Sequence, residues 1–153
     1  MIRGISAVLA VLLAAAVAQA ASVTVTQIKA SGSGGQVTVD PRLSDIKESL
    51  TKQFRFSRYD FLARSSSEVS SGSTSTWSLK TGESLDVRLD SAEGSGANTR
   101  YTLSLEVYYV DNRGKRQSEF RTQVRLAKGG TFLLGLGEYQ DLGGTMILAI
   151  KAQ

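Results

Sequence analysis

The sequence predicts an α+β fold that is mostly β: an antiparallel β-sandwich or curled sheet of roughly six to eight strands with one amphipathic helix. Three patterns predict this fold. Apolar and polar residues alternate through most of the chain after Phe56, which is typical of strands with one buried face. A single segment has helical apolar spacing. Two continuous apolar runs close the chain, as in strands that are covered on both faces.

The first 20 residues have the features of a secretory signal peptide. Arg3 precedes an apolar stretch that ends in small residues at Ala18 and Ala20. The stretch is shorter than the ~20 apolar residues that span a bilayer, so we expect cleavage after Ala20 or, as the alternative, after Ala18. The expected product is one exported domain, residues 21–153, with the periplasm as its compartment and no integral membrane span.

Composition excludes several classes of protein. The chain has no cysteine, so it forms no disulfide and carries no lipid on an N-terminal cysteine. It has no histidine, which removes Ser-His-Asp and Cys-His catalytic sets and the usual zinc sites. With 18 basic and 14 acidic residues the net charge is only +4, so we expect no nucleic-acid partner, and we expect no metal and no cofactor.

The exported domain opens with a segment rich in β-branched residues, Ser22–Ala30, which predicts a strand. Glycine and serine residues at 31–35 end this strand in a flexible loop. Val37–Val39 is again strand-like, but it is very short.

Residues Pro41–Gln53 predict the helix. Asp40 can cap the free amides, and Pro41 occupies a first position where its missing N–H does no harm. Four apolar residues recur at helical spacing and form one stripe: Leu43, Ile46, Leu50 and Phe54. Glu48 and Lys52, four residues apart, are expected on the solvated face.

Three segments after Phe56 alternate with period two and predict half-buried strands. Their apolar positions are Tyr59, Phe61 and Ala63, with Leu62 on the opposite face; Leu85, Val87 and Leu89; and Tyr101, Leu103, Leu105, Val107 and Tyr109. Ser65–Thr76 is nearly all serine, threonine and glycine, so we expect it to interrupt the pattern. A short strand is expected around Trp77 and Leu79.

The turn Asp111–Gly114 predicts a hairpin between the long strand before it and Gln117–Leu126. The apolar positions of the second strand face inward, so Arg121 and Arg125 face outward. The candidate binding face combines the hairpin's positive charges with one outward aromatic residue: Arg113, Lys115, Arg116, Arg121, Arg125 and Tyr108. Such a face suits an acidic partner or an anionic envelope polymer, although outward charges also discourage edge-to-edge pairing of strands.

Two glycine-flanked apolar runs, Thr131–Leu134 and Met146–Ile150, close the chain. Runs of this kind suit strands that are covered on both faces. We therefore expect the last strand at the centre of a sheet, beneath the helix.

A serine–lysine hydrolase is the most tempting catalytic hypothesis, because Ser49 and Lys52 fit S-x-x-K and Lys80–Gly82 fits K-T-G. Enzymes with these motifs need a far longer chain and a middle S-D-N element, which is missing here. Scattered carboxylates would support glycoside cleavage only if two of them met. We therefore expect no enzymatic activity.

The order of the elements resembles that of exported β-rich proteins of Gram-negative bacteria that have no assigned activity. The resemblance rests on the Asp40–Pro41 helix start and on the closing segments Gly129–Gly135 and Met146–Ile150. The closing segments are also locally similar to the hairpin of secretins, although the chain lacks the length and the repeated modules of a secretin. These resemblances imply a role in the cell envelope.

The leading hypothesis is a non-enzymatic periplasmic domain that binds another envelope protein, through a strand edge or through the basic hairpin face. The alternative is a binder of an anionic envelope polymer or lipid head group. A serine- or carboxylate-based hydrolase is a distant third.

Overall fold

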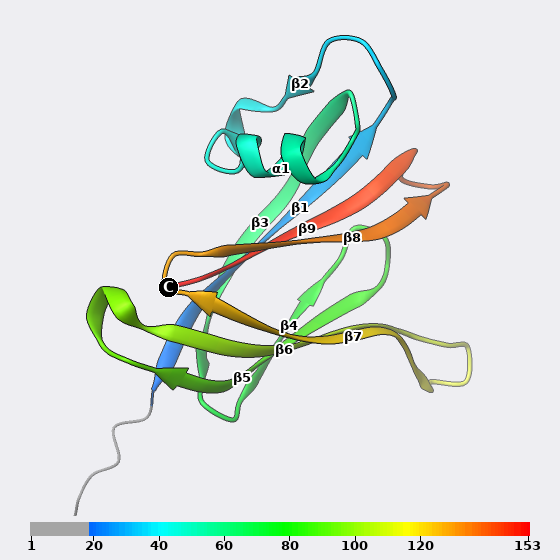
Figure 1. The fold of residues 1–153 in the computed structure, drawn as a ribbon. Coiled ribbons are helices and arrows are strands. Elements are labelled where there is room, and N and C mark those ends of the chain that lie inside the picture. The colour runs from blue at the N-terminus through cyan, green and yellow to red at the C-terminus, as the bar shows by residue number, and fades with distance from the viewer. Residues whose placement is uncertain (1–18) are drawn as a thin grey trace, which may run out of the picture.

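The computed structural model describes residues 19–153, which form a β-sandwich of two sheets (Figure 1). Most of the predicted signal peptide lies outside the described residues. Sheet A contains, in spatial order, β2 (Thr38–Val39), β3 (Arg58–Ser70), β1 (Ala20–Ser31), β9 (Gly144–Ala152) and β8 (Thr131–Tyr139). Sheet B contains β4 (Thr74–Ser78), β5 (Ser84–Glu93), β6 (Arg100–Val110) and β7 (Arg116–Ala127). All pairings are antiparallel except that of β2 with β3.

The predicted fold class is confirmed, although the described residues form more strands than expected. The interruption predicted at Ser65–Thr76 is wrong, because β3 continues to Ser70 and β4 begins at Thr74. Residues Ser65–Ser70 pair residue by residue with Ala20–Val25 of β1. Pairing with a central strand outweighs the weak β-propensity of serine. The short strand expected around Trp77 is β4.

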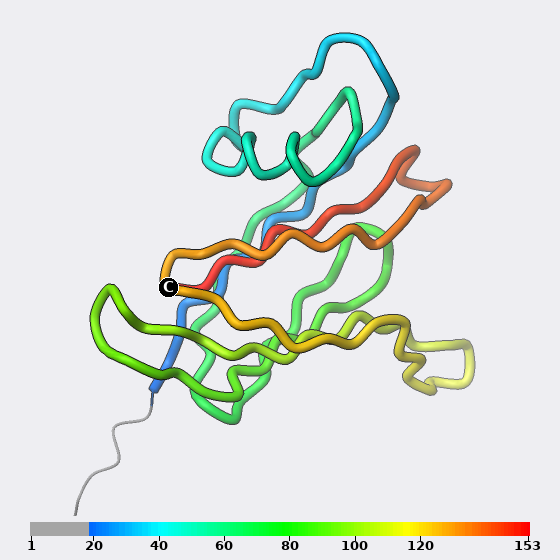
Figure 2. The backbone as a smooth tube through the Cα atoms, in the orientation of Figure 1, coloured from blue at the N-terminus to red at the C-terminus, as the bar shows by residue number. Residues whose placement is uncertain are grey.

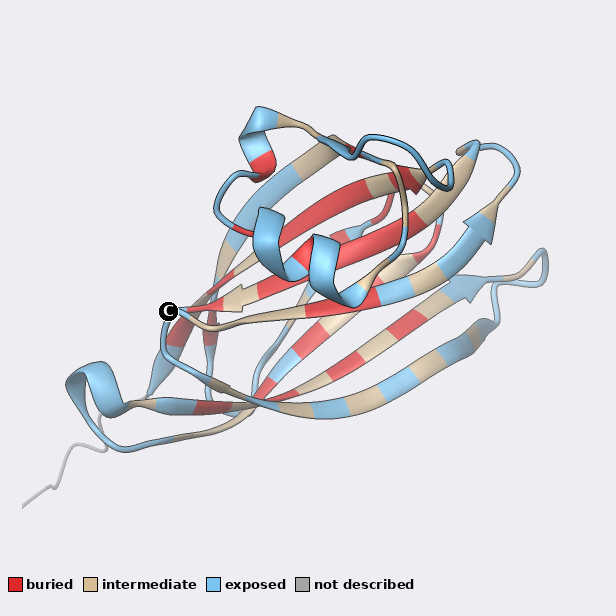
Figure 3. Cartoon of the chain, turned by 45° about the horizontal axis from the view of Figure 1, so that its top comes forward, coloured by how far each residue is buried: buried red, intermediate tan, exposed pale blue. Residues whose placement is uncertain are grey.

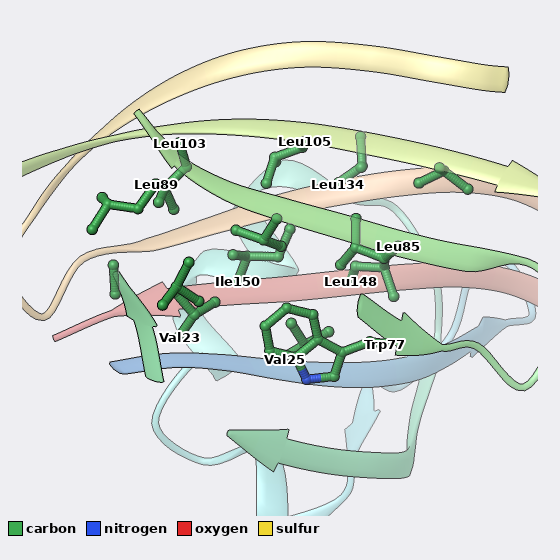
Figure 4. Packing of buried hydrophobic residues seen from close by; sticks show 14 of the residues in the cluster. Val23, Val25, Trp77, Leu85, Leu89, Leu103, Leu105, Leu134, Leu148 and Ile150 are labelled. Carbon is green, nitrogen blue, oxygen red and sulfur yellow. The ribbon is translucent and has the colours of Figure 1, made fainter. Parts of the chain in front are cut away.

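The chain crosses between the sheets twice, from β3 to β4 and from β7 to β8 (Figure 2). Apolar residues of both sheets fill the space between them and form the sandwich interior (Figure 4). Trp77 is 6 % exposed and lies beside Val25, and its Nε1 donates a hydrogen bond to the Ser65 carbonyl at 3.4 Å. Trp77 therefore closes the β3–β4 side of the sandwich.

The predicted continuous helix is instead a 3₁₀ turn, η1 (Pro41–Leu43), followed by α1 (Lys47–Gln53). Asp40 caps the turn by accepting the Arg42 N–H at 3.0 Å. At Ile46 the backbone leaves the helical region, with φ −117° and ψ 6°. The Ile46 N–H bonds to the Leu43 carbonyl at 3.1 Å, and both residues are buried on sheet A, because residues three apart share one face in 3₁₀ geometry.

The predicted apolar stripe is confirmed despite this break. Leu43, Ile46 and Leu50 are buried, and Phe54 packs beside them, in a second cluster between α1 and the outer face of sheet A (Figure 3). Ile147 and Ala149 of β9 lie in the same cluster, whereas Leu148 and Ile150 face the sandwich interior. The last strand thus lies between β1 and β8 and beneath the helix, as predicted.

The predicted hairpin is confirmed as β6 and β7, with Glu106 opposite Arg121. Its turn is held by Asp111, whose Oδ1 accepts the N–H groups of Arg113 and Lys115, each at 2.9 Å. The Lys115 N–H, with smaller contributions from Gln117 and the Arg113 N–H, lowers the pKa of Asp111. Gly114 has φ +77°, in the left-handed region that favours glycine.

Candidate functional site

The hairpin residues predicted to form a basic face divide into two groups. Tyr108, Arg116, Arg121 and Arg125 are strand residues whose side chains meet polar partners on the outer face of sheet B. Arg113 and Lys115 are exposed in the turn beyond the strands, and neither forms an ion pair within residues 19–153. The predicted residues therefore do not form one continuous basic surface.

Arg116, Arg121 and Arg125 of the outer face are each paired with a carboxylate. Arg116 contacts Asp86 at 2.8 Å and also contacts Glu106, and Arg121 reaches Glu106 at 2.5 Å. Farther along β7, Arg125 contacts Glu93 at 2.7 Å. The hydrogen bonds to Asp86 and then to Glu106 raise the pKa of Arg116. The charges of this face are therefore largely neutralised within the domain.

The only aromatic residue among the predicted site residues, Tyr108, is covered as well. The Arg116 guanidinium lies 3.5 Å from the centroid of the Tyr108 ring, and the Tyr108 hydroxyl donates to Asp86 at 3.3 Å. A shallow depression of about 410 Å³ is lined by Arg116, Arg121, Glu106 and their neighbours. The arginines in its walls already form ion pairs with Asp86 and Glu106. A polyanion would have to compete with these carboxylates, so the depression does not favour polyanion binding.

Sequence analysis missed the carboxylates of this face, because they come from β5 and from the first strand of the hairpin. Asp86 lies opposite Glu106, and Glu106 lies opposite Arg121, so one cross-strand row carries both signs of charge. The period-two pattern predicts that Asp86 and Glu106 face outward. The same pattern does not predict the strand register, and it is the register that places Asp86 and Glu106 beside the arginines.

The serine–lysine motifs are not brought together. Lys52 of α1 donates to Glu48 at 2.8 Å on the exposed side of the helix. Lys80 lies in the β4–β5 turn, where its N–H donates to Gln27 at 2.7 Å. Within residues 19–153 there is also no group of three or more acidic residues placed to hold a metal ion.

The outer edge of β8 carries unpaired backbone groups. The main-chain groups of Ala152 in β9 point toward β8: the Ala152 carbonyl accepts the N–H of Gly129, just before β8, at 2.7 Å. Gln153 instead exchanges two hydrogen bonds with Ser22 of β1, at 2.7 and 2.9 Å. Bonding directions alternate along antiparallel strands, so Phe132 and Leu134 of β8 bond to β9.

The alternate residues Thr131, Leu133 and Gly135 therefore direct their N–H and C=O groups away from the sheet. No other strand pairs with this side of β8 among residues 19–153. Beyond Gly135 the register shifts at a bulge before Gly137, whose φ is +110°. The straight part of the free edge is thus Thr131–Gly135, and it carries no charged side chain.

The neighbouring edge, β7, is different. The Lys128 N–H donates to the Thr99 carbonyl, and by the same alternation Arg121, Gln123 and Arg125 point their backbone groups outward. Two of these three residues carry charged side chains, which discourage strand pairing. At the far edge of sheet A, β2 has only two residues, and the Asp40 carboxylate accepts the Phe61 N–H of β3 at 3.3 Å. At the far edge of sheet B, β4 is uncharged and has five residues, and its Ser78 carbonyl accepts the Gln27 side-chain amide at 3.1 Å. The β8 edge is therefore an uncharged edge of the sandwich that no other strand among residues 19–153 covers.

The seam between the β7 and β8 edges exposes part of the sandwich interior. Half-buried apolar residues from both strands pack against the interior along this side: Phe120, Val124 and Leu126 from β7, and Phe132 and Leu136 from β8. The opposite side is closed by Trp77 and by a hydroxyl contact of 3.1 Å between Ser67 and Ser75. Half-buried apolar side chains thus lie next to the free edge of β8.

No family model matches the chain, and no curated protein and no solved structure matches it either. None of the helices in residues 19–153 is long and apolar enough to cross a bilayer. What the domain does must therefore be inferred from its own surface chemistry.

Proposed function

We propose that this chain is an exported, non-enzymatic protein-interaction domain of the cell envelope that binds an extended segment of a partner protein along the β8 edge. The observation that carries the proposal is the set of outward N–H and C=O groups at Thr131, Leu133 and Gly135. An extended main chain offers N–H and C=O groups at the matching spacing, so it can satisfy all of them at once.

The seam indicates the chemistry of the partner segment. Residues of an added strand that lie opposite Phe132 and Leu134 point their side chains toward the sandwich interior, where apolar surface is only half-buried. We expect the partner segment to carry apolar residues at alternate positions, with at least two of them over the seam.

Binding of an anionic polymer, the alternative hypothesis, has less support. Arg116, Arg121 and Arg125 are each paired with a carboxylate, so a polyanion would have to displace ion pairs that already exist. The envelope location rests on the signal-peptide pattern and on the resemblance to exported β-rich proteins of Gram-negative bacteria.

Export gives the first test. Expressed with a C-terminal tag in a Gram-negative host, the protein should be recovered from the periplasm with Ala21 as its first residue, because small residues precede that bond. Intact-mass measurement of the purified protein identifies the cleaved bond. An Ala20→Arg variant, which spoils this small-residue site, should accumulate uncleaved or be cleaved only at the alternative site after Ala18. Recovery of the full 153-residue chain from the cytoplasm would contradict export.

The β8 edge is tested with two proline variants. Thr131→Pro removes one outward N–H of β8, and Gln123→Pro removes an equivalent outward N–H of β7. A photo-cross-linking residue at the exposed position Glu138, beyond the straight edge, should capture the partner in the periplasm through one extended segment, mapped by mass spectrometry. With that partner purified, Thr131→Pro should weaken binding about tenfold or more, whereas Gln123→Pro should leave it unchanged.

Hydrogen exchange supplies the decisive measurement. Partner binding should slow exchange of the Thr131, Leu133 and Gly135 amides, while the outward amides of β7 stay fast. Equal protection of both edges, or loss of binding in both proline variants, would refute strand addition at β8. A steep fall in affinity with rising salt would favour the anionic-polymer hypothesis instead.

A further inference from the structure

A pocket of about 370 Å³ lies where the end of α1 meets the loop between β1 and β2. Its apolar lining comes from Val37, Phe54 and Phe56. Val37 is 46 % exposed, and few large apolar residues within 19–153 are exposed to this degree. Both phenylalanines are half-buried, so the pocket leaves aromatic surface in contact with water. Its volume lies within the range of about 300–1,000 Å³ typical of small-ligand sites.

Two positively charged residues, Arg55 and Lys52, also line the pocket. Lys52 already contacts Glu48 at 2.8 Å. Arg55 is exposed and forms no ion pair in the described part of the chain, unlike the arginines at 42, 58 and 64 nearby in sequence. The pocket therefore combines an apolar floor with a positive charge that nothing in the domain neutralises.

The walls also offer main-chain groups. Gly34 and Gly35 line the pocket with φ of +74° and +78°, and no atom lies within 4 Å of the positions that their side chains would occupy. On the helix side, the last carbonyls of α1 have no hydrogen-bond partner within the helix. A ligand that carries both an amide N–H and a carboxylate matches these groups better than a plain hydrocarbon chain does.

We propose that this pocket binds the C-terminal residue of a polypeptide, with an apolar side chain against Val37, Phe54 and Phe56 and the terminal carboxylate at Arg55. Capture of a terminal carboxylate by a cation and main-chain groups is a recurring mode of peptide recognition. This site is separate from the β8 edge and does not depend on strand addition there.

The test uses N-acetyl-L-phenylalanine as the ligand and its carboxamide as the matched control, titrated into the exported protein by NMR. The acid should shift the amide signals of Val37 and Phe56, and the carboxamide should bind about tenfold or more weakly, because it lacks the charge that Arg55 receives. Arg55→Gln should reduce binding of the acid to the level of the carboxamide. Arg113→Gln, which removes an exposed arginine without an ion pair far along the chain, should change nothing.

Three results would overturn the proposal. Equal binding of the acid and the carboxamide would show that no carboxylate is recognised. Binding of dodecanoate without binding of N-acetyl-L-phenylalanine would assign the pocket to a fatty chain rather than a polypeptide end. A lower melting temperature of Arg55→Gln with unchanged binding would mean that Arg55 only offsets the negative end of the helix dipole.

Discussion

Replacing Trp77 with alanine should lower the free energy of unfolding by about 3–5 kcal/mol, a large fraction of the total for a domain of this size. The indole is 6 % exposed in the sandwich interior and packs beside Val25. Truncation leaves a cavity on the side where β3 crosses to β4, and it removes the hydrogen bond to the Ser65 carbonyl. Urea unfolding followed by far-UV circular dichroism measures the loss, since the chain has no other tryptophan to report it.

Two variants sharpen this prediction. Trp77→Phe keeps most of the apolar volume but loses the Nε1 donor, so its cost should be clearly smaller than that of alanine. Tyr109→Ala removes a large side chain that is 43 % exposed, and it should change stability by no more than about 0.5 kcal/mol. If Trp77→Ala unfolded at the same urea concentration as Tyr109→Ala, the interior position of Trp77 would be wrong.

Much of the fold could be predicted from local patterns. The stripe through Leu43 and Leu50 needs only helical spacing, and the run at Met146–Ile150 needs only two-sided burial. The β6–β7 hairpin follows from one turn between two alternating segments. Each of these signals lies within a few residues of the chain, and the structure confirms each of them.

The errors come from long-range pairing. Ser65–Ser70 has little intrinsic preference for a strand and becomes one because β1 pairs with it. Leu62 faces the side opposite Tyr59 and Phe61, as the alternation predicts, and that side is the sandwich interior. The error is at Ala63: a register shift opposite Gln27 and Ile28 puts it out of step with Phe61, because the two residues pair with adjacent residues of β1. No nearby residue signals that shift.

The candidate sites depend even more on tertiary arrangement. The charges of β7 were visible in the sequence, but their neutralisation required the register of β5, β6 and β7. The apolar run at Thr131–Leu134 predicted two-sided burial, which is confirmed for Leu133 and Leu134. That the same strand also lies at a sheet edge follows only from the strand order.

Leu50→Ala should loosen the helical segment while the sandwich stays folded. Leu50 is fully buried between α1 and sheet A, in a cluster separated by sheet A from the sandwich interior. Truncating a buried leucine costs about 2–5 kcal/mol, and we expect this cost to appear as easier local opening of residues 41–56. Hydrogen exchange measures it: the Leu50 and Phe54 amides, which bond within α1, should exchange faster.

Amides of β5 and β6 should keep their protection in Leu50→Ala, because their apolar side chains pack in the other cluster. Lys47→Ala, on the exposed side of the same helix, is the matched control and should change neither region by more than about 0.5 kcal/mol. Uniform loss of protection across both sheets would mean that the two clusters unfold as one unit. Because Phe54 and Arg55 follow α1 directly, Leu50→Ala should also weaken the pocket for N-acetyl-L-phenylalanine, and this couples the proposed carboxylate site to the packing of a single leucine.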